Sequence, residues 1–146
     1  MTEKPWIFCF IDGTILDDRH RISLPNKGFD RLDLVEKDKP VSGSVEALNL
    51  LAEKYNILYM SARKDNIREL TLRWLRKYGY PEGEVYFGDT HEKRMEIVKK
   101  LKKEKNIVVG VGDRWDDNEM HLEIGCKSII LKEYEGDWNR VRKRLL

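Results

Sequence analysis

Five short apolar runs recur along the chain, and amphipathic stretches lie between them. The runs are rich in branched and aromatic residues and too short for buried helices, so each predicts a buried strand: residues 6–11, 56–60, 84–87, 106–111 and 128–131. Apolar residues recur with a helical period in residues 44–54, 66–78, 92–103 and 117–124, and residues 137–146 predict a last helix, a C-terminal helical tail. This alternation predicts an α/β fold, in which helices cover both faces of a parallel sheet.

The chain has 146 residues, the length of one domain, and we expect a single domain over residues 1–146. Open parallel sheets bind ligands in a crevice at the carboxyl ends of their strands. Residues 13–40 show no clear period, and we expect them to form an ordered flap or loop beside that crevice.

Composition excludes several classes of protein. Lys and Arg total 28 against 26 Asp and Glu, a formal charge of +2, which argues against a purely electrostatic nucleic-acid binder. No apolar stretch approaches the roughly 18 residues of a membrane span, and the N-terminus lacks a signal-peptide pattern. Two cysteines give no disulfide framework, which predicts a reducing, cytoplasmic setting. The absence of Gln beside abundant Glu and Lys is typical of a heat-adapted source.

Polar residues follow four of the predicted strands where each strand ends. They are Asp12-Gly13-Thr14, Ser61-Ala62-Arg63, Gly88-Asp89-Thr90 with Lys93 three residues on, and Gly112-Asp113 with Asp117. Carboxylate oxygens hold Mg²⁺, while hydroxyls, amides and a lysine neutralise phosphate oxygens. The set therefore predicts a site for a phosphate group with a hard divalent cation.

Each of these features also has an ordinary structural explanation. Asp12-Gly13 is a common turn, Ser61 a common helix cap, and Lys93 a common solvated side chain. Asp113 and Asp117 are spaced like acidic residues that complement a helix dipole. Their order and shared position at strand ends favour one site over independent coincidences.

With these motifs the chain resembles the phosphatases of the haloacid dehalogenase (HAD) superfamily over nearly its full length. Residues 10–16 are similar to the family's first motif, DxDGT(V/L), except at its opening position. Ser61 matches the second motif, Lys93 the third, and Asp113 with Asp117 the fourth. The resemblance implies a three-layer sandwich, Rossmann-like, with a central parallel sheet of about five strands in the order 3-2-1-4-5.

The resemblance also assigns roles to residues. It implies Mg²⁺ held by Asp12, Asp113 and Asp117, with Asp12 as the general acid or base and Lys93 beside it in the catalytic set. It implies phosphate binding by Gly13, Thr14, Ser61 and Arg63.

Phe10 departs from the family pattern, because it stands where the family has its nucleophilic aspartate. A benzyl group has no lone pair to attack phosphorus and no oxygen for a metal. Losing a covalent nucleophile typically costs roughly 10⁴- to 10⁶-fold in rate. Cys9 is no substitute, because strand alternation points it away from the face that Phe10 shares with Asp12.

Three accounts of the chain stay open. In the first it is a degenerate phosphatase that keeps the scaffold and a phosphate or metal site. In the second, Asp12, Asp113 and Asp117 still gather Mg²⁺ and a metal-bound water attacks directly. In the third it is a non-catalytic module that binds a partner through its helices or its basic tail.

The intervals between the motifs leave no room for an inserted cap domain, so the resemblance implies a capless member. An open crevice admits the end of a macromolecule, or another subunit closes it, as in a homo-oligomer. The segment from Ser61 to Pro81 is similar to the phosphatase domain of phage-type polynucleotide kinases, which favours a nucleotide or nucleic-acid phosphate end as substrate. Candidates for phosphate contacts at the rim are Arg19, Arg21, Arg63 and Arg68, and the three histidines are expected at the surface.

Overall fold

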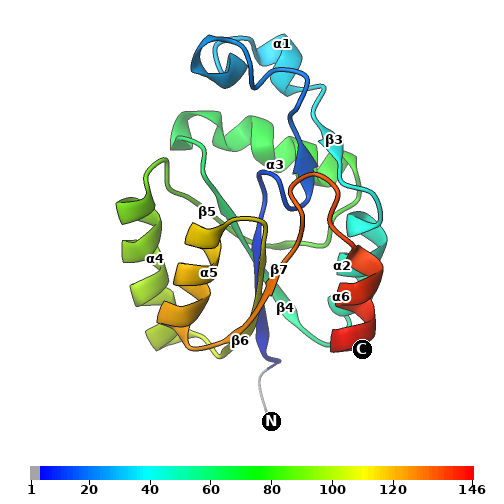
Figure 1. Ribbon diagram of the computed structural model, residues 1–146, viewed down its shortest axis with the longest axis vertical. Coiled ribbons are helices and arrows are strands. Elements are labelled where there is room, and N and C mark those ends of the chain that lie inside the picture. Colours follow the sequence, from blue (N-terminus) through cyan, green and yellow to red (C-terminus); the bar gives the residue numbers. More distant parts are fainter. Residues whose placement is uncertain (1–3) are drawn as a thin grey trace.

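A five-stranded parallel sheet forms the centre of the molecule in a computed structural model that describes residues 4–146 (Figure 1). Its strands are β1 (Trp6–Phe10), β4 (Asn56–Ser61), β5 (Gly83–Phe87), β6 (Ile107–Gly112) and β7 (Lys127–Ile130). They lie in the order β5-β4-β1-β6-β7, and every pairing is parallel. This arrangement confirms the predicted α/β class and the order 3-2-1-4-5.

Helices cover the two faces of the sheet and make three layers. Helices α2 (Ser44–Leu51), α3 (Arg68–Lys77) and α6 (Trp138–Leu145) pack on one face, and α4 (His91–Glu104) and α5 (Trp115–Ile124) pack on the other. Alternation along β1 decides which side chains reach which layer. Cys9 joins the core under α2 and α6, whereas Phe8 and Phe10 join the core under α4 and α5.

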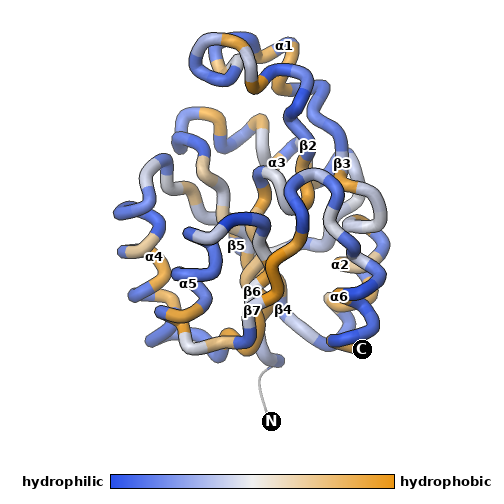
Figure 2. Tube along the Cα trace, viewed as in Figure 1, coloured by the Kyte–Doolittle hydropathy of each residue, from blue (hydrophilic) through white to orange (hydrophobic). Residues whose placement is uncertain are grey.

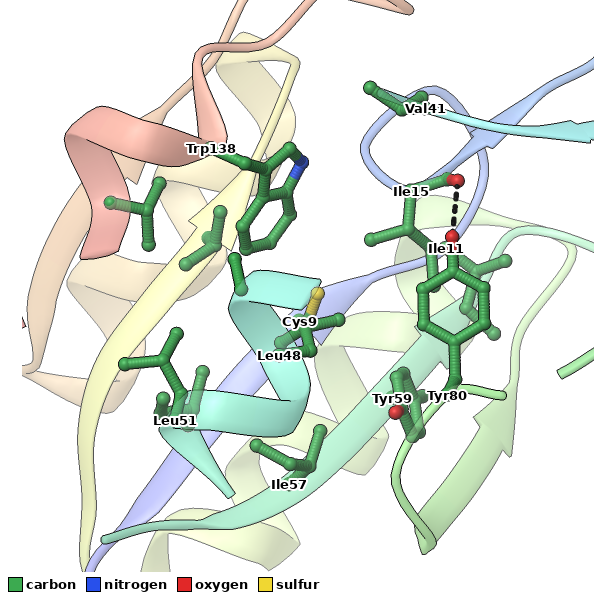
Figure 3. Close-up of a cluster of buried hydrophobic side chains, with 14 of the residues drawn as sticks. Cys9, Ile11, Ile15, Val41, Leu48, Leu51, Ile57, Tyr59, Tyr80 and Trp138 are labelled. Carbon is green, nitrogen blue, oxygen red and sulfur yellow. Dashed lines mark hydrogen bonds between the residues drawn. The ribbon is translucent and has the colours of Figure 1, made fainter. Parts of the chain in front are cut away.

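The buried apolar side chains come mainly from the predicted strands and helix faces. Figure 2 shows the apolar residues gathered along the central strands. Figure 3 shows the larger core, where α2 and α6 contribute Leu48, Leu51 and Trp138 over the strand residues Cys9 and Ile57.

The predicted helices all occur, with shifted ends. The α3 region begins with a 3₁₀ turn, η2 (Asp65–Ile67), and the helix ends before Gly79, whose φ of +80° is the left-handed conformation that stops a helix. Helix α5 begins at Trp115, two residues before the predicted start. None of the helices in the described chain is long and apolar enough to cross a bilayer.

Residues 13–40 form a flap of short elements at the carboxyl ends of the strands (Figure 1). They are β2 (Leu16–Asp17), η1 (Pro25–Gly28), α1 (Leu32–Val35) and β3 (Lys39–Pro40), and β2 pairs antiparallel with β3. The Tyr80 hydroxyl donates to the Ile15 carbonyl at 3.0 Å, which ties the base of the flap to the segment after α3 (Figure 3). Apart from these elements, the described residues include no inserted cap.

The packing of the core predicts that two Leu→Ala substitutions differ widely in their effect on the free energy of unfolding. Leu48 on α2 is fully buried, whereas Leu122 on α5 is 69% exposed. Leu48→Ala is expected to lower the free energy of unfolding by about 2–5 kcal/mol through the cavity it leaves. Leu122→Ala is expected to change it by less than about 0.5 kcal/mol. Urea unfolding of both variants measures this, and equal midpoints would contradict the assigned core.

Candidate functional site

A cavity of about 250 Å³ opens at the carboxyl ends of the strands, beside β1 and β6. The chain runs from β1 toward β5 on one side and from β6 to β7 on the other, so the strand order reverses there, and open sheets bind ligands at such a point. Six acidic and four basic side chains line the cavity: Asp12, Asp18, Asp113, Asp116, Asp117 and Glu133 with Lys27, Arg63, Arg94 and Arg114. The cavity is thus strongly polar, with an excess of carboxylates.

Asp12 lies just beyond β1, and donors from the β4 end surround its carboxylate. Oδ2 accepts from Ser61 Oγ at 2.9 Å and from the Ala62 amide at 3.0 Å, and Oδ1 accepts from Arg63 Nε at 2.9 Å. Burial by itself would raise the pKa of Asp12, but the Arg63 charge and these hydrogen bonds outweigh it and hold the pKa below its usual value. Asp12 is therefore ionised and fixed in one orientation.

Asp38, at the end of the flap, is the fully buried partner of two arginines. Arg21 donates to it twice, from Nε at 2.8 Å and from Nη2 at 2.7 Å, and Arg63 donates from Nη2 at 2.8 Å. The Asp38 carbonyl also accepts from Trp74 Nε1 on α3 at 2.8 Å. The flap is thereby joined to α3 and, through Arg63, to Asp12.

Asp113 and Asp117 lie after β6 in different surroundings. Asp117 Oδ2 accepts from the amides of Asp113 and Arg114, at 2.9 and 3.0 Å, as a cap of helix α5. Asp113 Oδ1 accepts from Thr14 Oγ1 at 2.7 Å, while its Oδ2 is buried without a partner in the described chain. Burial raises the pKa of Asp113 well above its usual range, and the Asp117 and Glu133 charges raise it further, against the Thr14 hydrogen bond.

Phe10 forms the floor of the cavity and is only 5% exposed. Its ring packs edge-on against Phe8, with centroids 5.1 Å apart, and lies 5.9 Å from the His121 ring. The end of β1 therefore presents an aromatic ring to the cavity, and the Phe10 side chain has no polar atom to offer there.

His121 is fully buried behind Phe10, so the expectation that all three histidines lie at the surface is wrong for this residue. Gly110 makes room for the ring, because a Cβ at this position would overlap it. Ser128 Oγ donates to Asn118 at 2.7 Å, so His121 Nδ1, 2.7 Å from Ser128 Oγ, is the donor of that pair. Its Nε2 has no partner in the described chain.

Lys93 does not line the cavity. Its side chain is 62% exposed, and its ammonium pairs with Asp89 at 2.8 Å. The next residue, Arg94, is buried and lines the cavity, with its guanidinium on the Gly88 carbonyl at 2.8 Å and near Asp116 at 3.4 Å. Arg94 shares the inner face of α4 with Val98 and Leu101, and this helical period was the signal in the sequence that distinguished it from Lys93.

The residues assigned to phosphate binding are mostly engaged with carboxylates. Thr14 donates to Asp113, Ser61 donates to Asp12, and the buried Arg63 uses Nε, Nη1 and Nη2 on Asp12, Thr71 and Asp38. Gly13 (φ +85°) approaches Asp113 so closely that a side chain would collide with it. Arg94, Arg114 and Lys27 also line the cavity and were missed by the sequence analysis.

The four rim arginines are also paired. Arg19 binds Asp17 at 2.6 Å and Arg68 binds Asp65 at 2.6 Å, while Arg21 and Arg63 are buried against Asp38. Arg21 and Arg63 are thus buried in ion pairs, whereas Arg19 and Arg68 are exposed and paired with nearby carboxylates.

The side chains predicted to bind magnesium do not by themselves form a metal site. The described residues contain no group of three or more Asp, Glu, His or Cys side chains placed to hold one metal ion. Donors at the β4 end hold Asp12, and amides hold Asp117. Asp113 Oδ2, buried and without a partner, is the carboxylate oxygen here that a hard cation would satisfy.

A family model described as HAD superfamily, subfamily IIIB (Acid phosphatase), matches residues 2–137. The chain belongs to this family. No curated protein matches the sequence. Membership agrees with the resemblance recognised in the motifs and with the fold.

Solved structures share the fold at low sequence identity. The structure of an L-2-haloacid dehalogenase, PA0810, has a TM-score of 0.74 at 11% identity and covers 99% of this chain and 100% of its own. A chain of the Pnkp1/Rnl/Hen1 RNA repair complex has a TM-score of 0.69 at 22% identity over 94% of this chain, which spans only 45% of that longer chain. The HAD family enzyme bt-2542 from Bacteroides thetaiotaomicron, solved with magnesium and inorganic phosphate, has a TM-score of 0.59 at 12% identity over 95% of this chain and 99% of its own.

The Asp38 network predicts the cost of removing one buried charge. Asp38→Asn removes the buried carboxylate that Arg21 and Arg63 share and is expected to lower the free energy of unfolding by about 3–5 kcal/mol. Asp33→Asn removes an exposed pair with Arg31 and is expected to cost less than about 1 kcal/mol. Guanidinium unfolding compares the two variants, and similar midpoints would show that the network contributes little.

The burial of His121 predicts that the protein loses stability in mild acid. Burial lowers its pKa to about 4 from the ordinary 6.5, so the unfolded chain binds the proton more readily. The free energy of unfolding is therefore expected to fall by roughly 2–3 kcal/mol as the pH falls from above 6.5 toward 4. NMR titration of the ring and urea unfolding between pH 7 and 4.5 measure the two effects, and His121→Gln should flatten the stability profile. A ring that titrates near pH 6.5 would contradict the assigned burial.

Proposed function

We propose that this chain is a phosphate-ester-binding member of the acid phosphatase family whose covalent step is impaired. The observation that carries the proposal is the Phe10 ring, buried at the end of β1 where the first motif of the family has its nucleophile. The rest of the cavity keeps the charged groups that a phosphate site needs, Asp12 and Asp113 among them.

Asp12 supports the acid–base part of this proposal. Its carboxylate is ionised, fixed and 19% exposed, at the edge of the cavity. A general acid or base without a nucleophile completes only half of a covalent phosphoryl transfer. The chain is therefore expected to bind a phosphate ester and to turn it over slowly.

Mg²⁺ is the proposed cofactor, with Asp113 as its principal side-chain ligand and Asp117 holding the loop that carries Asp113. When bound, the cation neutralises both the carboxylates and the phosphate oxygens. Arg94 and Arg114 line the same cavity and are proposed to contact the anion, a role first assigned to Lys93.

The proposed ligand class is a nucleotide or a nucleic-acid end bearing a phosphate. Two observations support it. The described residues include no cap beyond the flap, so the cavity is open to a long ligand. The matched chain of the RNA repair complex also shares the fold over 94% of this chain.

Restoring a carboxylate at residue 10 tests the impaired step. Phe10→Asp is expected to raise Mg²⁺-dependent hydrolysis of p-nitrophenyl phosphate by at least about 10²-fold, because it supplies the missing nucleophile. Phe10→Asn introduces a side chain of the same size as Asp but without a nucleophilic carboxylate. Its rate of hydrolysis is expected to equal that of the natural chain. A covalent phosphoryl adduct on residue 10, detected by mass spectrometry, should accompany the gain.

Two results would overturn the proposal. Equal hydrolysis by the natural chain and Phe10→Asp, with both folded by circular dichroism, would show that Phe10 is not the limiting feature. Rapid Mg²⁺-dependent turnover by the natural chain would favour attack by a metal-bound water instead.

A further inference from the structure

A second cavity of about 570 Å³ adjoins the first, between the flap and the segment that leads into α3. Lys27, Phe29, Ala62 and Arg63 line both cavities. The two cavities are therefore adjacent, and a ligand longer than one phosphate ester could reach from the first to the second across these shared residues.

The flap wall at this junction is a strained turn. Asn26 and Lys27 both have φ near +54°, and Gly28 follows at +75°. A left-handed conformation costs a residue other than glycine roughly 1 kcal/mol or more, and such strain persists only where surrounding contacts hold it. Arg21 holds the turn by donating from Nη1 to the Lys27 carbonyl at 2.8 Å, so the Asp38 network fixes the position of Lys27.

Two lysines on opposite sides of the second cavity have no ion-pair partner among the described residues. Lys27 comes from the flap and Lys64 from the segment after β4, and both are exposed. Two carboxylates also line this cavity: Asp89 is 2.8 Å from the Lys93 ammonium, and Asp30 accepts from Asn26 Nδ2 at 3.4 Å. By contrast, Arg63, which separates the two cavities, is fully compensated by Asp12 and Asp38.

The second cavity also offers apolar surface beside these cations. Leu24, Phe29 and Ile67 contribute to its walls, and Asn66 adds an amide. Cationic and apolar groups within one cavity suit a strand of nucleic acid, which carries phosphates beside sugars and bases. A small single anion would contact only the cationic side chains of this cavity.

We infer that the second cavity is a subsite for the internal phosphodiester next to the terminal phosphate of a nucleic-acid strand, with Lys27 and Lys64 as its cationic contacts. The inference rests on the proposed function, because the terminal phosphate occupies the first cavity. It makes the flap a specificity element that distinguishes a strand end from a mononucleotide.

Binding of three probes to the natural chain with Mg²⁺ tests the subsite: inorganic phosphate, a nucleoside monophosphate, and a dinucleotide with a terminal phosphate at the 3′ or 5′ end. The better dinucleotide is expected to bind about tenfold more tightly than the mononucleotide in calorimetry. Lys64→Met, which lies outside the first cavity, should remove about threefold or more of that preference, with inorganic phosphate binding unaffected. Lys27→Met, at the junction of the two cavities, should also reduce the preference. Lys37→Met, also exposed on the flap but outside both cavities, is the matched control.

Salt dependence separates a phosphate contact from a structural role. Each lysine that neutralises a phosphate of a single strand contributes about 0.7 to the slope of log affinity against log salt. Lys27→Met should lower the slope by about this amount, and Lys27→Arg should restore it.

The outcomes for the subsite and for the proposed function differ. Equal affinity for mononucleotide and dinucleotide, or an unchanged dinucleotide preference in Lys64→Met, would overturn the subsite while the first cavity keeps its function. Failure of all three probes to bind would overturn the proposed function and the subsite together.

Discussion

The carboxylate of Asp38, buried between Arg21 and Arg63, holds the flap against the rest of the molecule. Burying three charged groups is costly unless each finds its partner, and here both carboxylate oxygens and all six guanidinium nitrogens are hydrogen-bonded. Arg63 continues the network to Asp12, and Arg21 continues it to the strained turn at Lys27. One ion cluster thus orients Asp12 at the first cavity and Lys27 at the wall of the second.

In this cluster and beside it, several motif residues hold carboxylates in place. The hydroxyl of Ser61 and the guanidinium of Arg63 serve to fix Asp12, and Thr14 serves to fix Asp113. The basic residues left to face a ligand are Arg94, Arg114 and Lys27, from three different elements. With Phe10 in its lining, the cavity combines charged side chains with an aromatic surface, and the proposed function rests on this combination.

Much of the fold was predictable because its signals are local. Short branched runs and helical periods identify strands and helices from neighbouring residues, and alternation in β1 placed Cys9 and Phe10 on opposite faces. The strand order came from the family resemblance. Lys93 was named because a motif marks a position along the chain, whereas the inward face of α4 decides that Arg94 is the side chain that lines the cavity. His121 was misplaced because nothing local reveals the space that Gly110 leaves for its ring.

The sequence by itself determined the α/β class, the polar residues at the strand ends and the missing carboxylate at residue 10, since each depends on residue type and spacing. Only the tertiary structure decided which charges meet. Arg63 lies 25 positions from Asp38 and 51 from Asp12, and Thr14 lies 99 from Asp113. Hydrogen bonds form between groups within about 3 Å, and that proximity follows from how the strands and the flap pack, which no local pattern encodes.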